Sequence, residues 1–181
     1  MPNKHIGKYE QKFMKYKKKY INLTKKFYNQ YAGGDGSIKY VASILLHKDD
    51  HGTQILLLQR NRDDKWMTPG GHVEKKDYIV NETNEQAYKK ALKREFYEET
   101  GFEMPKLNKM KEYVYNKNTK LYIGYIDHID MGDFKSNNEA HSIGLFSLDM
   151  LRKHDYKIET IPLVSYVRSS LVLLDKEGYL K

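Results

Sequence analysis

The sequence contains no cysteine, which excludes disulfide bonds and metal sites built from thiolates. It also contains no apolar run that approaches the roughly eighteen residues of a membrane-spanning helix. The first residues are rich in lysine and lack an apolar segment, so they do not resemble a secretory signal. With 181 residues, the chain is long enough for one domain with a proper core. We therefore expect a cytoplasmic protein with no membrane partner.

Positive charge is concentrated at one end of the chain. Residues 1–40 hold ten lysines against two acidic side chains, whereas the remaining residues hold 22 basic and 22 acidic side chains. Apolar residues recur every three or four positions through residues 1–31 with lysines between them, which predicts a basic amphipathic helix. Its apolar stripe fits docking on the protein's own domain or a coiled coil. Its charge fits either a solvated helix face or contact with RNA.

The glycine-rich residues 32–37 predict a flexible joint before a domain at residues 38–181. A strand at Lys39–His47, a turn at Asp49–Gly52 and a strand at Gln54–Gln59 predict a hairpin. The other expected elements are strands at Glu112–Tyr115, Leu121–Asp127 and Ser142–Phe146, a loop at Met131–Ala140, a helical turn at Leu148–Arg152 and a closing helix at Ile161–Asp175 with a buried stripe of Leu163, Val167, Leu171 and Leu174.

Three acidic residues stand out in the segment REFYEETGF. Glu95, Glu98 and Glu99 are spaced i, i+3 and i+4, so they share one face of a helix. Crowded carboxylates repel one another, and desolvating them is costly. Such a cluster is either a solvated charged face or a site where hard divalent cations bind oxygen ligands and hold a phosphate substrate.

The surroundings of this cluster favour the cation site. An apolar run and the Pro-Gly-Gly turn of WMTPGGHVE precede the acids, and Gly101 follows them where a helix takes a left-handed cap. The whole unit resembles the Nudix box, and its second half matches at every defined position from Arg94 to Phe102. This resemblance implies an α/β fold, a Nudix-like α/β/α sandwich with a mixed sheet. It also implies a metal-dependent pyrophosphohydrolase that uses Mg²⁺ or Mn²⁺.

The first half of the box departs from the family pattern, because the distance from Gly71 to Arg94 is nine residues longer than usual. Counting back from Arg94 places the spaced glutamate of the pattern at Gln86, whereas the stretch NETNEQA places it at Glu82. Thr83 followed by Gln86 forms a capping-box pattern, which predicts a helix that starts just after Thr83. That helix would run about one turn longer than usual, which keeps its acidic face in place, and the other extra residues would lengthen the loop at residues 74–81.

The resemblance also implies roles for individual residues. The implied metal ligands are Glu95, Glu98, Glu99 and the Gly70 carbonyl. Glu139, which precedes a Ser-Leu-Asp turn, is either an added ligand or general base, or a solvated loop acid. By the same resemblance Arg94 braces the box, with contact to substrate phosphate as the alternative.

Four further residues are candidates for substrate binding. Trp66 either stacks on a base or packs in the fold. Gly71 gives the backbone room beside the metals. His72 either contacts a phosphate or has a packing role, and Tyr78 lies in the lengthened loop beside the site, where insertions tune the substrate.

The expected substrate is a nucleotide-like molecule or an RNA cap in which a nucleoside diphosphate is linked to another group. The run KYEQKFMKYKKKY resembles N-terminal segments of giant DNA virus proteins, which favours a viral mRNA-decapping enzyme in the host cytoplasm. The alternatives are a hydrolase of small substrates such as nucleoside triphosphates, nucleotide sugars or inositol pyrophosphates, and a catalytically silent nucleotide- or RNA-binding module. Because Nudix proteins often dimerise, a homodimer is a further expectation.

Overall fold

The computed structural model of the chain describes residues 38–79, 82–106, 108–127, 131–132 and 134–180. The predicted basic helix at residues 1–31 and the joint at 32–37 lie outside this part. The strands are β1 (Tyr40–Asp49), β2 (Gly52–Arg60), β3 (Trp66–Met67), β4 (Gly70–His72), β5 (Asn108–Asn116), β6 (Thr119–Ile126) and β7 (Ala140–Ser147). The helices are the 3₁₀ turn η1 (Lys75–Asp77), α2 (Asn84–Thr100), α3 (Leu148–Lys153) and α4 (Ser165–Lys176).

The strands form one mixed sheet, as predicted. Its main path runs β3-β2-β1-β6-β5, with β4 paired to β1 and β7 paired to β2. β1 and β6 are parallel along eight paired residues, whereas the other pairs are antiparallel. The predicted β1–β2 hairpin is confirmed. β1 begins one residue later than predicted and ends two residues later, whereas β2 extends beyond its predicted bounds at both ends.

The two strands of the hairpin separate away from their turn. They pair only from Leu46 with Ile55 to Asp49 with Gly52. Farther from the turn, β1 pairs with β4, where Ala42 lies opposite Gly70, while β2 pairs with β3 and β7. This separation places the Pro-Gly-Gly segment directly beside the first half of β1.

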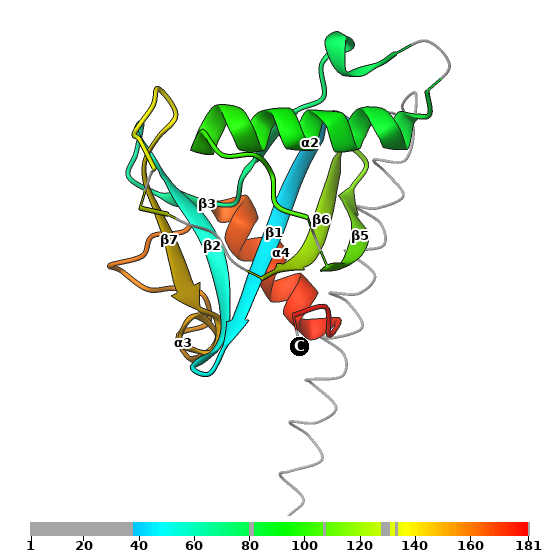
Figure 1. Cartoon of the computed structure of the whole chain (residues 1–181). Helices are drawn as coiled ribbons and strands as arrows, with labels where there is room; N and C mark the ends of the chain where they lie inside the picture. Colours follow the sequence, from blue (N-terminus) through cyan, green and yellow to red (C-terminus); the bar gives the residue numbers. More distant parts are fainter. Residues whose placement is uncertain (1–37, 80–81, 107, 128–130, 133, 181) are drawn as a thin grey trace, which may run out of the picture. The chain divides into compact units, whose positions relative to one another are not determined.

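Helices cover both faces of the sheet (Figure 1). Successive strand residues point to opposite faces, and β1 follows this rule. Val41 and Leu45 belong to the apolar clusters that include residues of α2, whereas Ile44 and Leu46 belong to the cluster that includes residues of α4. The result is the helix–sheet–helix layering that we expected.

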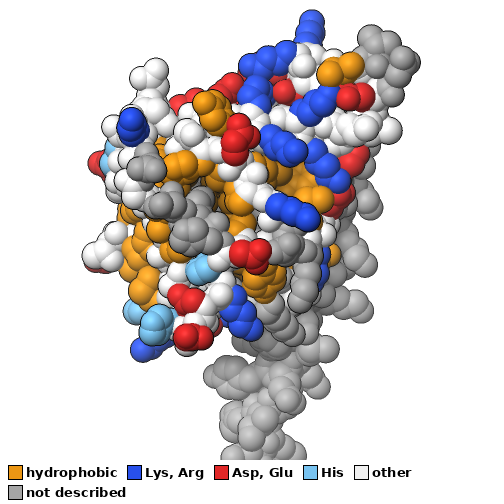
Figure 2. Space-filling model, viewed as in Figure 1, with side chains coloured by type: hydrophobic (Ala, Val, Ile, Leu, Met, Phe, Trp, Pro, Cys, Tyr) orange, Lys and Arg blue, Asp and Glu red, His pale blue; other side chains and the backbone are white. Residues whose placement is uncertain are grey.

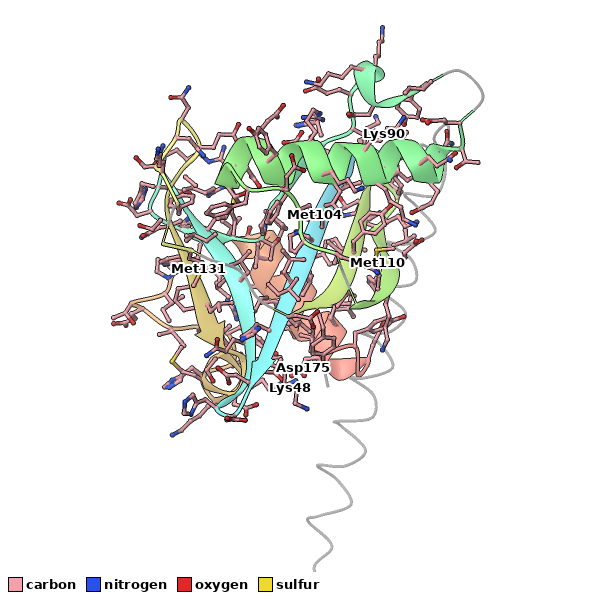
Figure 3. The ribbon with its side chains drawn as sticks, in the orientation of Figure 1. Lys48, Lys90, Met104, Met110, Met131 and Asp175 are labelled. Atoms are coloured by element: carbon pink, nitrogen blue, oxygen red, sulfur yellow. The ribbon has the colours of Figure 1, made fainter. Side chains whose placement is uncertain are left out.

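The first core layer lies under α2. Phe96 on this helix packs with Leu45 and Leu56 and is completely buried. Met104, labelled in Figure 3 beside α2, contacts the same cluster. No helix among the described residues is both long enough and apolar enough to cross a membrane.

Capping chemistry sets the ends of α2. The Gln86 amide N–H donates to the Thr83 hydroxyl, and the Thr83 N–H donates to the Gln86 side chain at 2.8 Å. Gly101 ends the helix in the left-handed conformation, with its N–H donating to the Tyr97 carbonyl at 2.8 Å. The predicted helix start just after Thr83 and the predicted stop at Gly101 are both confirmed.

The closing helix begins later than predicted, at Ser165 instead of Ile161. The Trp66 N–H donates to the Pro162 carbonyl at 2.8 Å, and the Val164 N–H donates to the Trp66 carbonyl at 2.9 Å. These bonds hold the segment extended against β3, so it cannot take helical dihedral angles. The expected start was therefore wrong because a contact between distant segments overrides local pattern.

Most of the predicted apolar stripe of α4 is nevertheless buried. Val167, Leu171 and Leu174 have no exposed surface, whereas Leu163, which precedes the helix, is only partly buried. The helix therefore closes the second core layer with three of the four predicted residues.

A charged cluster joins α2 to β5 and β6. Lys120 is buried, and its ammonium forms ion pairs with Glu85 and, at 2.6 Å, with Glu112. Lys89 bonds to Glu112 at 3.0 Å, and the Tyr122 hydroxyl donates to Glu85 at 2.8 Å. Figure 2 shows basic and acidic side chains side by side over α2. This cluster pairs charges that would otherwise oppose the docking of the helix.

We predict that Glu112→Gln lowers the free energy of unfolding and makes it less dependent on pH. The hydrogen bond from Lys120 lowers the pKa of Glu112 from 4.5 to about 2. A lowered pKa stabilises the fold above pH 4.5, and this stabilisation is lost as the pH falls through about 2. The free energy of unfolding should drop by about 1 kcal/mol at neutral pH, since solvent screens this partly exposed pair. Urea denaturation between pH 7 and 2 measures it.

The matched control for this prediction is Glu159→Gln, which changes an exposed acid elsewhere on the surface. It should keep the wild-type profile. An unchanged dependence on pH in Glu112→Gln would contradict the assignment of the cluster.

Candidate active site

The site begins where residues 69–72, here called the glycine segment, meet α2. The Gly70 N–H donates to Glu99 Oε2 at 2.8 Å. Gly70 has φ 152°, and a Cβ there would overlap the Val41 carbonyl on the neighbouring strand. A Cβ on Gly71 would overlap the carboxylate of Glu95. Both glycines are therefore needed for the close approach of the acidic helix face to β4.

Four acidic side chains gather beside this segment. Glu99 is only 2% exposed, and burial raises its pKa well above the ordinary value, with added repulsion from Glu139, Glu95 and Glu98. Burial also raises the pKa of Glu95, with repulsion from Glu98 and Glu139, although Arg94 opposes it. Glu139, in the loop before β7, therefore lies within electrostatic reach of Glu95 and Glu99.

Arg94 is the hub of this cluster. Its Nη1 donates to Glu95 at 2.7 Å and to Glu98 at 3.0 Å. Its Nη2 donates to the His72 carbonyl at 2.8 Å and to Asp77 at 3.0 Å, and its Nε donates to Asp77 at 3.1 Å. The bonds to Asp77, followed by those to Glu95, raise the pKa of Arg94. All three guanidinium nitrogens are therefore occupied by the acids and the glycine segment.

A model of the NUDIX domain family matches residues 38–165, which include the sheet, the glycine segment and the acidic helix. The chain belongs to the Nudix family. Its fold is similar to that of the Nudix hydrolase RenU from M. smegmatis, with 16% identity, a TM-score of 0.51, and coverage of 80% of this chain and 87% of that one.

A second similar structure is the NUDIX domain of Shewanella oneidensis NrtR complexed with ADP ribose. It is 16% identical, has a TM-score of 0.50, and the match covers 81% of this chain and 90% of that one. At this sequence identity, both matches show similarity of fold alone. No curated protein matches the chain.

One residue that anchors Arg94 in the Nudix box was missed by the sequence analysis. Asp77 is buried and forms a two-oxygen pair with Arg94. Burial alone would raise the pKa of Asp77, but hydrogen bonds from Arg94 and from the Glu74 N–H lower it. Asp77 is separated from Gly71 by five residues, so counting forward from the glycine would have found it.

The two residues that we considered for this position bind elsewhere. Glu82 pairs with Lys90, which is labelled on α2 in Figure 3. Gln86 caps the start of the helix with Thr83. The nine extra residues therefore lie between Asp77 and Arg94, because Asp77 stands at the distance from Gly71 at which the family pattern has its glutamate.

Trp66 is held mainly by packing. Its ring meets Phe146 edge-on, with 4.5 Å between the centroids, and is partly buried. Its backbone bonds to the segment before α4, as described above. These contacts fit the packing interpretation, and stacking on a base stays a prediction for the part of the ring that is exposed.

His72 and Tyr78, which precede and follow η1 in the sequence, are both exposed. The His72 ring packs on Tyr40 with 4.1 Å between the centroids, while its carbonyl accepts from Arg94. Tyr78 is 41% exposed and immediately follows Asp77. Both side chains are therefore accessible, and a role in substrate binding stays a prediction.

The acids offer the right donor atoms for hard divalent cations, which prefer carboxylate oxygen. Among the described residues, however, no three acidic or histidine side chains form a ready-made ligand set. Arg94 holds Glu95 and Glu98, and the Gly70 amide holds Glu99. The residues fit a cation chemically, and binding it requires the cation to compete with Arg94 for two carboxylates.

We predict that Asp77→Asn destabilises the fold and disrupts the acidic cluster, because Arg94 loses the charge that anchors it. Removing one partner of a buried pair costs about 3 kcal/mol. Glu82→Gln is the matched control and should cost less than about 1 kcal/mol, since its pair with Lys90 is partly exposed. Urea denaturation of both variants tests this; equal losses would show that Asp77 is no better a brace than Glu82.

Proposed function

We propose that this Nudix protein is a metal-dependent hydrolase that cleaves a diphosphate linkage in a nucleoside-diphosphate-linked substrate. The observation that carries the proposal is the convergence of Glu95, Glu98, Glu99 and Glu139 beside the glycine segment, with burial and mutual repulsion raising the pKa of Glu95 and Glu99. A protein gains little stability from such a cluster, so a role in binding cations accounts for it best.

The residues that would hold Mg²⁺ or Mn²⁺ are Glu95, Glu98, Glu99, the Gly70 carbonyl and Glu139. When bound, such ions neutralise phosphate charge and lower the pKa of a coordinated water so that it becomes a nucleophile. A bound cation would offset the repulsion that helps to raise the pKa of Glu95 and Glu99.

The other groups of the site orient and assist. Arg94 keeps the acidic face of α2 aligned with the glycine segment through His72 and Asp77. Glu139 is exposed at the loop before β7 and is therefore free to accept a proton from the attacking water. Glu99 is the most deeply buried of the acids and forms the fixed end of the ligand set.

Two observations support the proposed substrate class. The NrtR domain with a similar fold was solved with ADP ribose, a nucleoside diphosphate linked to a sugar. In this chain Trp66, Gly71, His72 and Tyr78 lie on the segments that flank the acids and would contact the substrate. The excess of lysine in residues 1–40 supports RNA as the linked group, since phosphate contacts dominate RNA affinity. A viral mRNA-decapping enzyme is the form of the proposal that this charge favours.

The test is product analysis with Mg²⁺ and with Mn²⁺ on two substrate sets. One set is RNA with a labelled cap phosphate, and the other contains nucleoside triphosphates, nucleotide sugars, ADP ribose and inositol pyrophosphates. We expect release of a labelled cap diphosphate. Glu98→Gln should lower kcat by about 100-fold to 1000-fold, because a lost cation ligand removes several kcal/mol of transition-state stabilisation.

The matched control is Glu103→Gln, an exposed acid just beyond the end of α2, which should turn over substrate at the wild-type rate. Turnover of small substrates alone would replace the decapping form of the proposal with a small-molecule hydrolase. Binding without turnover in both sets would overturn the hydrolase and leave a nucleotide-binding module.

A further inference from the structure

The side chain of Asn137 joins the loop of Glu139 to the end of α2. Its Nδ2 donates to the Glu99 carbonyl at 2.7 Å and to the Glu98 carbonyl at 3.3 Å. Carbonyls in the last turn of a helix have no partner within the helix. Asn137 therefore satisfies two such groups, and both belong to acids of the candidate active site.

The other end of the same amide orders the backbone of the loop. Asn137 Oδ1 accepts from the Glu139 N–H at 2.8 Å and from the Ala140 N–H at 3.0 Å. The Asn137 N–H donates to the Ala140 carbonyl at 2.9 Å. One side chain thus fixes the backbone of Glu139 and, through its opposite end, the helix that carries Glu98 and Glu99.

A second asparagine holds the loop from the side of the sheet. Asn61, which follows β2, donates from Nδ2 to the Asn137 carbonyl at 2.6 Å and from its backbone N–H to the Glu139 carbonyl at 3.0 Å. Its Oδ1 lies 3.0 Å from His141 Nδ1. The loop is therefore anchored on both sides, and the backbone of Glu139 is bonded through both its N–H and its carbonyl.

We propose that Asn137 is a positioning residue that sets the place of the Glu139 carboxylate relative to Glu98 and Glu99. The inference rests on the proposed function, because it assigns Glu139 a task in hydrolysis. Only an amide side chain of this length offers a donor to the helix and an acceptor to the loop at once. Losing the tie would let the carboxylate move, and a shift of about 1 Å lowers a rate by roughly 100-fold.

The first experiment compares kcat and KM of Asn137→Ala, Asn137→Asp and the control Asn138→Ala, using the substrate that the wild-type protein hydrolyses best. Asn138 is the neighbouring residue of the same type and is exposed. We expect kcat to fall by about 10-fold to 100-fold in both Asn137 variants, with KM changed less than about twofold. The aspartate keeps the acceptor for the loop, cannot donate to the helix carbonyls and adds a negative charge beside them, so it should lower kcat at least as far as the alanine does.

A double-mutant cycle with Glu139→Gln separates positioning from general damage to the fold. If Asn137 acts through Glu139, then adding Asn137→Ala to Glu139→Gln lowers kcat no further. An equal additional loss of kcat in the Glu139→Gln background would overturn the proposal. So would a wild-type kcat in Asn137→Ala.

Hydrogen exchange provides a readout that does not depend on turnover. The amides of Glu139 and Ala140 should lose protection in Asn137→Ala and keep it in Asn138→Ala. Unchanged protection in Asn137→Ala would overturn the anchoring role even if the wild-type protein hydrolysed nothing in the panel. Lack of wild-type turnover with lost protection would instead reject the hydrolase while supporting the anchor.

Discussion

The structure of the site depends on one guanidinium group. Arg94 donates to an acid on η1, to a carbonyl of the glycine segment and to two acids of α2. The planar guanidinium of arginine carries five N–H donors and can therefore bind several oxygens at once. A lysine ammonium lacks this geometry and could not replace it. Without this charge the acidic helix face would repel itself, so Arg94 makes the cluster compatible with a folded domain.

The remaining ties join segments that are distant in the sequence. The Gly70 amide holds Glu99, and Asn137 holds the end of the same helix although it lies 38 residues away from Glu99. The separation of β1 from β2 makes room for this arrangement beside the sheet. The site is therefore built from polar contacts between the ends of regular elements, while the apolar clusters under α2 and α4 keep those elements in place.

Much of α2 and its acidic face could be predicted from the sequence. The capping pair Thr83 and Gln86, the stop at Gly101 and the shared face of the acids follow from residues within a few positions of one another. The start of α4 and the anchor at Asn137 could not be predicted, because each is decided by a contact with a remote segment. Asp77 was within reach of sequence reasoning, which failed because the insertion was counted from the wrong end of the box.

Residues 78–82, which are part of the expansion of the box, lie between two fixed points. Asp77 is bonded to Arg94 on one side, and Thr83 caps α2 on the other. A doubling of loop length costs only about 0.6 kcal/mol in closure entropy. Evolution can therefore lengthen or shorten this segment without moving the carboxylates, and a motif search with fixed spacing would overlook relatives that have done so. The segment is a natural place to graft a new recognition element onto an unchanged catalytic frame.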